Sequence, residues 1–252
     1  MTVKGLSDWL NSAAGDYVFA WELERYDAMV GDIFGYNALQ IGLPGHDFLR
    51  NSRITHHFSL SPDDATASMR ATPFALPIAS SSIDLVILPH VLEFSRYPHR
   101  VLREVERVLM PDGSVIVSAF NPFSLFGLRR LVAGPGASEP WRGQYFSLFR
   151  LRDWLTLLGF ETEPAHFGCF APPVQSRPWI ERWSRLDRAG HRLWPICGGV
   201  YMLHGIKRVH GMRMIAPKWR SAAEQRKGLV SATRRAGKVP AHHSSTHTEE
   251  KT

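Results

Sequence analysis

The clearest alternation of apolar and polar positions lies between Ser80 and Pro122, and it predicts one strand–helix–strand unit. The apolar run from Ile83 to Leu88 is typical of a strand covered on both faces. Pro89 ends this strand, because proline cannot donate to the ladder. A second apolar run, Val115 to Val117, predicts the next strand. Between them, apolar residues recur at helical spacing: Val101, Leu102, Val105, Val108 and Leu109. A unit of this kind predicts a right-handed parallel crossover.

The polar face of the predicted helix carries charges of both signs, at Arg100, Arg103, Glu104, Glu106 and Arg107. Glu104 and Arg107 are three residues apart and are therefore placed to pair, although an exposed pair of this kind contributes only about 0.2–0.5 kcal/mol. Pro111-Asp112-Gly113 predicts a tight turn before the second strand, in which proline fixes φ and glycine tolerates a positive φ.

Other elements follow from the same reading. Residues 6–30 have interrupted apolar faces and are expected to be helical. Ala38 to Ile41 predicts a first strand, and Ile54 to Pro62 a second strand with its exit. Leu148 to Gly159 predicts a helix that ends at Gly159, a plausible position for a left-handed cap. Further strands are expected from Phe160 and over Val200 to Arg208.

The string ALPIASSSIDLVILPHVLEF, followed by HRVLREVERVLMPDGSVIVSAFNP, resembles the class I S-adenosylmethionine-dependent methyltransferases, in particular those that act on small molecules. The similarity is dense from Thr72 to Asn121 and traceable from Leu39 to Val209. It implies an α/β fold: a Rossmann-like sheet of seven mostly parallel strands, with an antiparallel last strand. We expect a helical segment over 1–37, a methyltransferase-like domain over 38–210 and an insertion at about 169–199.

The resemblance implies a cofactor site for S-adenosylmethionine, of which the first part is a glycine-rich turn. Gly42 and Gly45 fall in this turn, where the absence of a β-carbon lets the backbone approach a ligand closely. The segment LQIGLPGHDF occupies the place of a motif like LDLGCGTGRF, and only Gly42 matches in register. Gln40 stands at the position of the usual acid, and Pro44 and His46 replace the later glycines.

The second part of the implied site follows the next strand. Ser59, with Leu60 after it, stands where the family usually has an acid that binds the ribose hydroxyls. Thr72 stands at the position of an acid near the adenine, two residues before Phe74. Because a charged hydrogen bond contributes about 1.5–3 kcal/mol, replacing the ribose acid by serine should weaken binding. Either other residues compensate, with Asp63 and Asp64 as candidates, or the affinity is low, or the cofactor has been lost.

Residues just past the first buried strand are the candidates for chemistry. Pro89 and His90 are expected beside the cofactor, and His90 and Glu93 could each act as a catalytic base. Alternatively His90 binds backbone or cofactor, and Glu93 caps the helix or pairs with an arginine. Tyr145 and His166 are weaker candidates. For Asn121 two roles stay open: orienting a substrate, or capping the next helix.

Composition excludes several classes of protein. Two cysteines, Cys169 and Cys197, exclude a disulfide framework and a multi-cysteine zinc site, and we expect both to be buried. No apolar run approaches the roughly 20 residues of a transmembrane helix. The N-terminal stretch has no secretory h-region, so we expect a cytoplasmic location. A nucleotide-binding oxidoreductase is disfavoured, because no G-x-G-x-x-G turn with a downstream acid is present.

Much of the positive charge lies in the last 36 residues. The stretch from Pro217 to Thr252 carries a net charge of +5, out of +7 for the whole chain. It lacks sustained apolar periodicity, so we expect a disordered basic tail over 217–252. The tail is either a solvating extension or a weak electrostatic contact for nucleic acid or an anionic membrane. Three histidines in it could bind metal only adventitiously: His242, His243 and His247.

The insertion over 169–199 combines an apolar stripe with interleaved arginines, including Trp179, Trp183 and Arg182. Three interpretations stay open: a helix over the sheet edge, a substrate lid, or an interfacial membrane helix. The last two would fit an apolar acceptor.

For the protein as a whole, the sequence favours S-adenosylmethionine-dependent methylation of a small-molecule acceptor. The alternative is a non-catalytic, methyltransferase-like binding or scaffold protein. The N-terminal helices either cover the cofactor's methionine end or serve packing alone.

Overall fold

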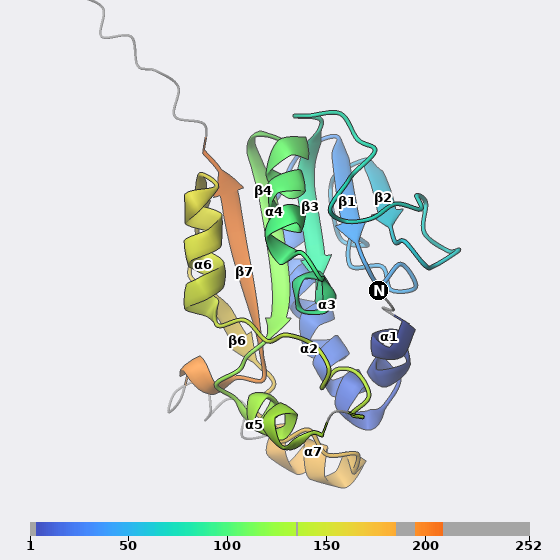
Figure 1. The fold of residues 1–252 in the computed structure, drawn as a ribbon, viewed down its shortest axis with the longest axis vertical. Helices are drawn as coiled ribbons and strands as arrows, with labels where there is room; N and C mark the ends of the chain where they lie inside the picture. The colour runs from blue at the N-terminus through green and yellow to red at the C-terminus, as the bar shows by residue number, and fades with distance from the viewer. Residues whose placement is uncertain (1–3, 135, 185–194, 209–252) are drawn as a thin grey trace, which may run out of the picture. The chain divides into compact units, whose positions relative to one another are not determined.

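The computed structural model describes residues 4–134, 136–184 and 195–208, all within a unit that ends at His210. Its centre is a seven-stranded sheet (Figure 1). The strands are β1 (Asn37–Ile41), β2 (His56–Leu60), β3 (Ile83–Pro89), β4 (Leu109–Phe120), β5 (Phe160–Thr162), β6 (His166–Gly168) and β7 (Val200–Lys207). Their order in the sheet is β2-β1-β3-β4-β7-β5, and β6 also pairs with β7.

Strand directions confirm the expected fold class. β1 pairs in parallel with both β2 and β3, and β3 pairs in parallel with β4. β7 is antiparallel to β4, β5 and β6, so the last strand alone runs against the others. The first four strands therefore end at one edge of the sheet, which we call the carboxyl edge. In open α/β sheets this is the edge at which ligands bind.

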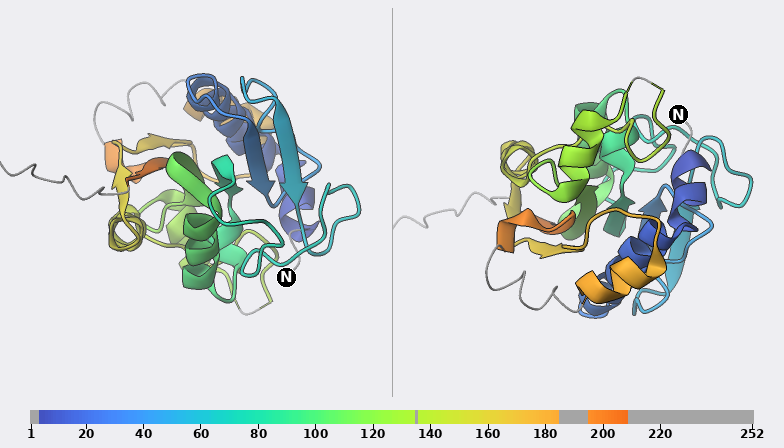
Figure 2. Two further views of the ribbon diagram at one scale, coloured as in Figure 1. Left: turned by 90° about the horizontal axis from the view of Figure 1, so that it is seen from above. Right: turned by 90° about the horizontal axis from the view of Figure 1, so that it is seen from below.

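Helices cover both faces of the sheet (Figure 2). They are α1 (Lys4–Leu10), α2 (Ala13–Val30), α3 (Val91–Phe94), α4 (Pro98–Val108), α5 (Leu125–Val132), α6 (Leu148–Leu157) and α7 (Arg177–Ser184). One buried cluster joins α4 and α6 to Val86 and Leu88 of β3. The other joins α2 to Leu85 and Ile87 of the same strand. Alternate residues of β3 thus face the two layers, as the period of a strand requires.

The connections on the β2 side of the sheet contain no helix. Residues 42–55 join β1 to β2, and residues 61–82 join β2 to β3, through turns and single bridges alone. A parallel crossover usually carries a helix that buries a face of the sheet. Here α2 supplies much of that cover from the N-terminal side, since Val18, Tyr26 and Val30 are fully buried against the sheet. The expected helices within residues 6–30 are thus confirmed as α1 and α2.

The strand–helix–strand unit is confirmed as β3, α4 and β4, with one difference at the predicted turn. β4 begins at Leu109, and Pro111-Asp112-Gly113 lies inside it as a bulge. Across this bulge the partner of Ile83 is Leu109, whereas the partner of Leu85 is Ser114. The positive φ falls on Asp112, at 60°, rather than on the glycine. The sequence interpretation of Gly113 as the left-handed residue was therefore wrong.

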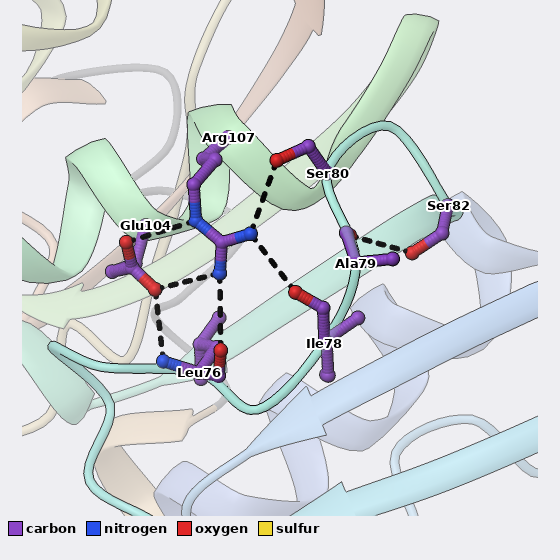
Figure 3. Close-up of polar contacts among 7 residues, drawn as sticks. All are labelled: Leu76, Ile78, Ala79, Ser80, Ser82, Glu104 and Arg107. Carbon is purple, nitrogen blue, oxygen red and sulfur yellow. Dashed lines mark hydrogen bonds and ion pairs between the residues drawn. The ribbon is translucent and has the colours of Figure 1, made fainter.

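Glu104 and Arg107 of α4 pair as their spacing predicts, at 2.9 Å, and they also hold the segment that leads into β3 (Figure 3). Glu104 accepts a hydrogen bond from the Leu76 amide at 2.8 Å. Arg107 donates to the Leu76 and Ile78 carbonyls, at 3.0 and 2.9 Å. The guanidinium lowers the pKa of Glu104, although desolvation opposes the shift. The pair therefore holds the backbone of residues 76–78 in place, in addition to the ion pair that its spacing predicted.

After β4, the helix predicted over residues 148–159 is present, and one of the two predictions for the cysteines is wrong. α6 ends as predicted, with Gly159 at a φ of 84°. Within the 169–199 insertion, α7 packs against α2 through the buried Ile180, while Trp179 stays exposed. This helix lies on another helix, and the three interpretations of the predicted insertion stay untested. Cys169 is buried, but Cys197 is exposed, so the expectation that both cysteines are buried was wrong for Cys197.

The predicted basic tail, 217–252, lies outside the described residues, and its role stays a prediction. The same holds for the three tail histidines. Among the helices that the structure describes, none has the length and apolar character needed to cross a bilayer. The cytoplasmic location also stays a prediction.

Candidate functional site at the carboxyl edge

The turn after β1 faces the turn after β3. Gly42 has a φ of 84°, a conformation that strongly favours glycine. A β-carbon at Gly42 would lie 2.9 Å from Val91 Cγ2 and 3.7 Å from the Pro89 carbonyl oxygen. Gly45 differs, because a β-carbon there would meet no atom within 4 Å. Gly42 thus brings two turns of the carboxyl edge together, and Gly45 leaves open space.

Gln40 holds the turn in place with both the nitrogen and the oxygen of its side-chain amide. Its Nε2 donates to the carbonyls of Gly42, Leu43 and His46, at 3.2, 2.9 and 2.7 Å. Its Oε1 accepts from the amide of Phe48 at 3.2 Å. The side chain is buried. Gln40 therefore organises residues 42–48, and its predicted contact with a cofactor stays untested.

The residues at the predicted ribose and adenine positions are bonded within the protein. The Ser59 hydroxyl lies 3.2 Å from the Ser68 hydroxyl and accepts from the Ser68 amide at 3.0 Å. Leu60 is buried, and its carbonyl accepts from the Gly42 amide at 2.8 Å. The Thr72 carbonyl accepts from Ala75 at 3.1 Å, and Phe74 packs edge-on against Tyr97. No carboxylate stands at either predicted position.

Two cavities flank the glycine turn. One, of about 270 Å³, is lined by residues of the turn and of β2, including Gln40, Ser59 and Ser68. The other, of about 20 Å³, lies among Ser7 of α1, Gly45 and the acids Asp63 and Asp64. Small-molecule sites usually measure about 300–1,000 Å³. A nucleoside-sized ligand would therefore need the cover formed by α1 or by the 62–64 segment to move.

His90 lies inside the protein, between two carboxylates. Its Nδ1 is 3.0 Å from Glu93 Oε2, and its Nε2 is 2.9 Å from Glu22 Oε1. The three side chains have no exposed surface. The second oxygen of Glu93 accepts a short hydrogen bond from the Phe120 amide. His90 itself has a φ of 54° and stacks on the Phe120 ring at 4.2 Å. The cluster thus joins α2, the β3 exit and the end of β4.

Burial and charge both act on the protons of this cluster. Burial lowers the pKa of His90, but Glu22 and Glu93 outweigh it and raise the pKa from 6.5 to about 10. Burial also raises the pKa of Glu93, against the opposing effect of His90. Since both ring nitrogens lie against carboxylates and no surface is exposed, His90 and Glu93 do not reach a substrate in this geometry. Their predicted roles as catalytic bases stay untested, and the geometry supports a positioning role.

Glu22 is the member of this cluster that the sequence did not indicate as a candidate. It occupies the middle of a buried stripe on α2, at Val18, Glu22, Tyr26 and Val30. The four positions follow each other at spacings of four residues, so they share one helix face. An acid within such an apolar stripe is the signal that could have identified it, because a buried charge needs a partner.

Of the remaining candidates, Tyr145 borders the cluster through Phe120, whereas His166 lies apart from it. The side-chain Nδ2 of Asn121 donates to the carbonyls of Ile196 and Gly198, at 2.7 and 2.9 Å. Ser124, and not Asn121, caps α5, so the capping interpretation of Asn121 was wrong. Tyr145 stacks on Phe120 at 5.2 Å. His166 lines a separate cavity of about 560 Å³, together with residues at the start of β4 and the end of β7.

Comparisons with known proteins agree with this architecture. Residues 53–117 match the family model described as a methyltransferase domain. The uncharacterized protein YafS of Escherichia coli is 31% identical over 210 residues, which cover 83% of this chain and 84% of that protein. A malonyl-[acyl-carrier protein] O-methyltransferase of Laribacter hongkongensis is 31% identical over 115 residues, 45% of this chain and 37% of that protein.

Solved structures share the fold. A methyltransferase of Thermotoga maritima, described as S-adenosylmethionine-dependent and a possible histamine N-methyltransferase, has a TM-score of 0.60 at 19% identity, over 81% of this chain and 94% of that one. A methyltransferase from Archaeoglobus fulgidus gives 0.54 at 15% identity, over 75% and 93%. The fold is that of the class I methyltransferases. The chain belongs to one family with YafS, and residues 53–117 place a methyltransferase domain of the class I fold within it.

The family's cofactor is S-adenosylmethionine, and the described residues fit it in part. Gly42 keeps the β-carbon-free turn beside β3, and Gly45 leaves space above it. Ser59 and Ser68 offer hydroxyls at the predicted ribose position in place of a charge. The fit therefore requires the cover over the 20 Å³ cavity to open, and it lacks the charged bond worth about 1.5–3 kcal/mol.

Proposed function

We propose that the protein is an S-adenosylmethionine-dependent methyltransferase that acts on a small-molecule acceptor. The observation that carries the proposal is the geometry of Gly42, whose positive φ and close approach to Pro89 and Val91 keep the family's turn at the carboxyl edge. Gly42, Gly45 and Ser59 are the residues we expect to hold the cofactor. Thr72 and Phe74 would border the adenine, and Leu60 supports the turn from below.

The bound cofactor would supply an electrophilic methyl group, so the protein's own task is largely to position the acceptor. His90 contributes by holding the β3 exit in its left-handed turn, with one carboxylate on each ring nitrogen. Pro89 and Val91, on either side of it, form the wall that faces Gly42. In this account His90 and Glu93 are positioning residues that keep this wall rigid.

A second candidate function is a non-catalytic binding or scaffold role. The specific observation that favours it is the state of the cofactor position: Gln40 is fully used by the turn, and the cavity beside α1 measures only about 20 Å³. A scaffold would keep the sheet and the charged cluster without ever admitting the cofactor.

The experiment that tests the proposal follows labelled methyl groups. The full chain is incubated with methyl-labelled S-adenosylmethionine and a cell extract separated into small molecules and macromolecules. Label in the small-molecule fraction supports the proposal. Label in protein or nucleic acid alone contradicts the acceptor class. No transfer by a folded protein, together with no binding of S-adenosylhomocysteine, favours the scaffold.

A further inference from the structure

A second cavity lies beside the carboxyl edge, between α4 and α6. It measures about 440 Å³, which lies within the usual range for small-molecule sites. Its walls come from the α4 N-terminus, the end of α5, residues 144–146 and the first turns of α6. The lining includes His99, Arg130, Gln144, Tyr145, Arg150 and Trp154.

The charge of this cavity has one sign. Arg130 and Arg150 line it, and no lining residue is acidic. Among the described residues, neither arginine forms an ion pair with a carboxylate, whereas Arg50, Arg107, Arg177 and Arg208 all do. Arg130 donates one hydrogen bond, from Nε to the Gly143 carbonyl, at 2.6 Å. Its terminal nitrogens remain available for a ligand, and a guanidinium prefers carboxylate or phosphate oxygens.

Aromatic rings hold the cations in place and give the cavity flat walls. Arg130 lies 5.3 Å over the Tyr145 ring, and Arg150 lies 5.4 Å over the Trp154 ring. His99 packs against the other part of this wall, 4.0 Å from Trp154. Guanidinium groups stacked in this way lose less freedom when they bind an anion. The walls themselves suit a flat apolar body.

The position of the cavity connects it to the proposed active site. The Gln144 amide donates to the Glu93 carbonyl at 2.8 Å, and Tyr145 stacks on Phe120 at the end of β4. Phe120 in turn stacks on His90. The cavity therefore borders the same structural cluster that holds the β3 exit.

We propose that this cavity binds a small organic anion, a carboxylate or phosphate on a flat apolar body, with Arg130 and Arg150 as its anion-binding residues. Resting on the proposed function, we assign this anion as the methyl acceptor. The binding itself needs no methyl donor, so it can be measured separately.

The test titrates the full chain, without S-adenosylmethionine, with benzoate and phenyl phosphate, using benzyl alcohol as the neutral probe and ligand-observed NMR as the readout. We expect both anions to bind more tightly than the alcohol. Arg130→Gln and Arg150→Gln should each weaken anion binding about tenfold or more. Arg103→Gln, an exposed change on α4 outside the cavity, should leave binding unchanged.

Thermal unfolding of each variant verifies that the fold is intact. Arg150→Lys keeps the positive charge but lacks the planar guanidinium, so it should lose only part of the affinity for the anions. Equal binding of the alcohol, no binding of either anion, or unchanged affinity in both glutamine variants would overturn the proposal. If the anions bind but S-adenosylhomocysteine does not, the site stands and the proposed methyltransferase activity fails. The reverse result removes the anion site and leaves that activity.

Discussion

His90 Nε2 lies 2.9 Å from Glu22 Oε1, and both side chains are fully buried. This contact joins α2 to the turn that ends β3. Glu93 completes the cluster on the other ring nitrogen. Burying three ionisable groups is costly unless they are paired, so removing one partner should leave an uncompensated charge.

Stability should fall as the pH rises from 7 to 10. The pKa of His90 is raised from 6.5 to about 10, so the folded state holds more protons than the unfolded chain in this interval. This contribution is complete below pH 6.5 and is lost as the pH passes through about 10. The raised pKa of Glu93 acts in the same direction at lower pH. Urea unfolding at several pH values measures the slope.

Glu22→Gln should flatten that slope, because one of the two carboxylates that raise the His90 pKa is removed. Its matched control is Glu24→Gln, an exposed acid on the same helix, which should keep the slope of the parent protein. A slope of the same size in both variants would show that the buried contact does not hold the His90 proton.

Gln40→Glu should destabilise the protein, although it restores an acid at the position where the family usually has one. A carboxylate cannot donate to the Gly42, Leu43 and His46 carbonyls, and it would place a negative charge against them. We expect a loss on the order of 3 kcal/mol in the free energy of unfolding. Gln175→Glu, at an exposed position, controls for the added charge. An unchanged Gln40→Glu variant would mean that the turn is not held by this amide.

Gly42→Ala and Gly45→Ala form a matched pair. The first places a β-carbon 2.9 Å from Val91 and forces alanine to a φ of 84°, so it should cost about 1–3 kcal/mol of stability. The second meets no atom within 4 Å, so its stability should change by less than about 0.5 kcal/mol. If Gly45 borders the cofactor, its variant should still weaken cofactor binding. Equal stability losses would contradict the geometry of the turn.

Arg107→Ala should lower the free energy of unfolding by about 1–2 kcal/mol, because it removes the charged hydrogen bonds to the Leu76 and Ile78 carbonyls. Their partial exposure to water keeps the loss from being larger. Arg103→Ala removes a charge of the same sign from the same helix and serves as its control. Chemical denaturation measures both. A similar small effect in the two variants would show that Arg107 is an ordinary surface residue.

Local pattern was enough to predict the unit of β3, α4 and β4, because strand and helix periods record burial directly. The seven-stranded sheet and its antiparallel last strand were implied by the family resemblance instead. Long-range polar contacts were not predictable in the same way. The partner of His90 is Glu22, 68 positions earlier in the sequence, and nothing between the two residues specifies their meeting. The anion cavity likewise joins side chains from three helices. At the bulge of β4 the positive φ lies on Asp112 and not on Gly113, one residue away from the predicted position.

Calorimetric titration of the full chain with S-adenosylhomocysteine tests the central claim most directly. We expect saturable binding that Gly45→Ala weakens while the fold stays intact. No detectable heat at millimolar ligand, from protein that unfolds cooperatively, would contradict the claim that this member of the family holds the cofactor at Gly42 and Gly45.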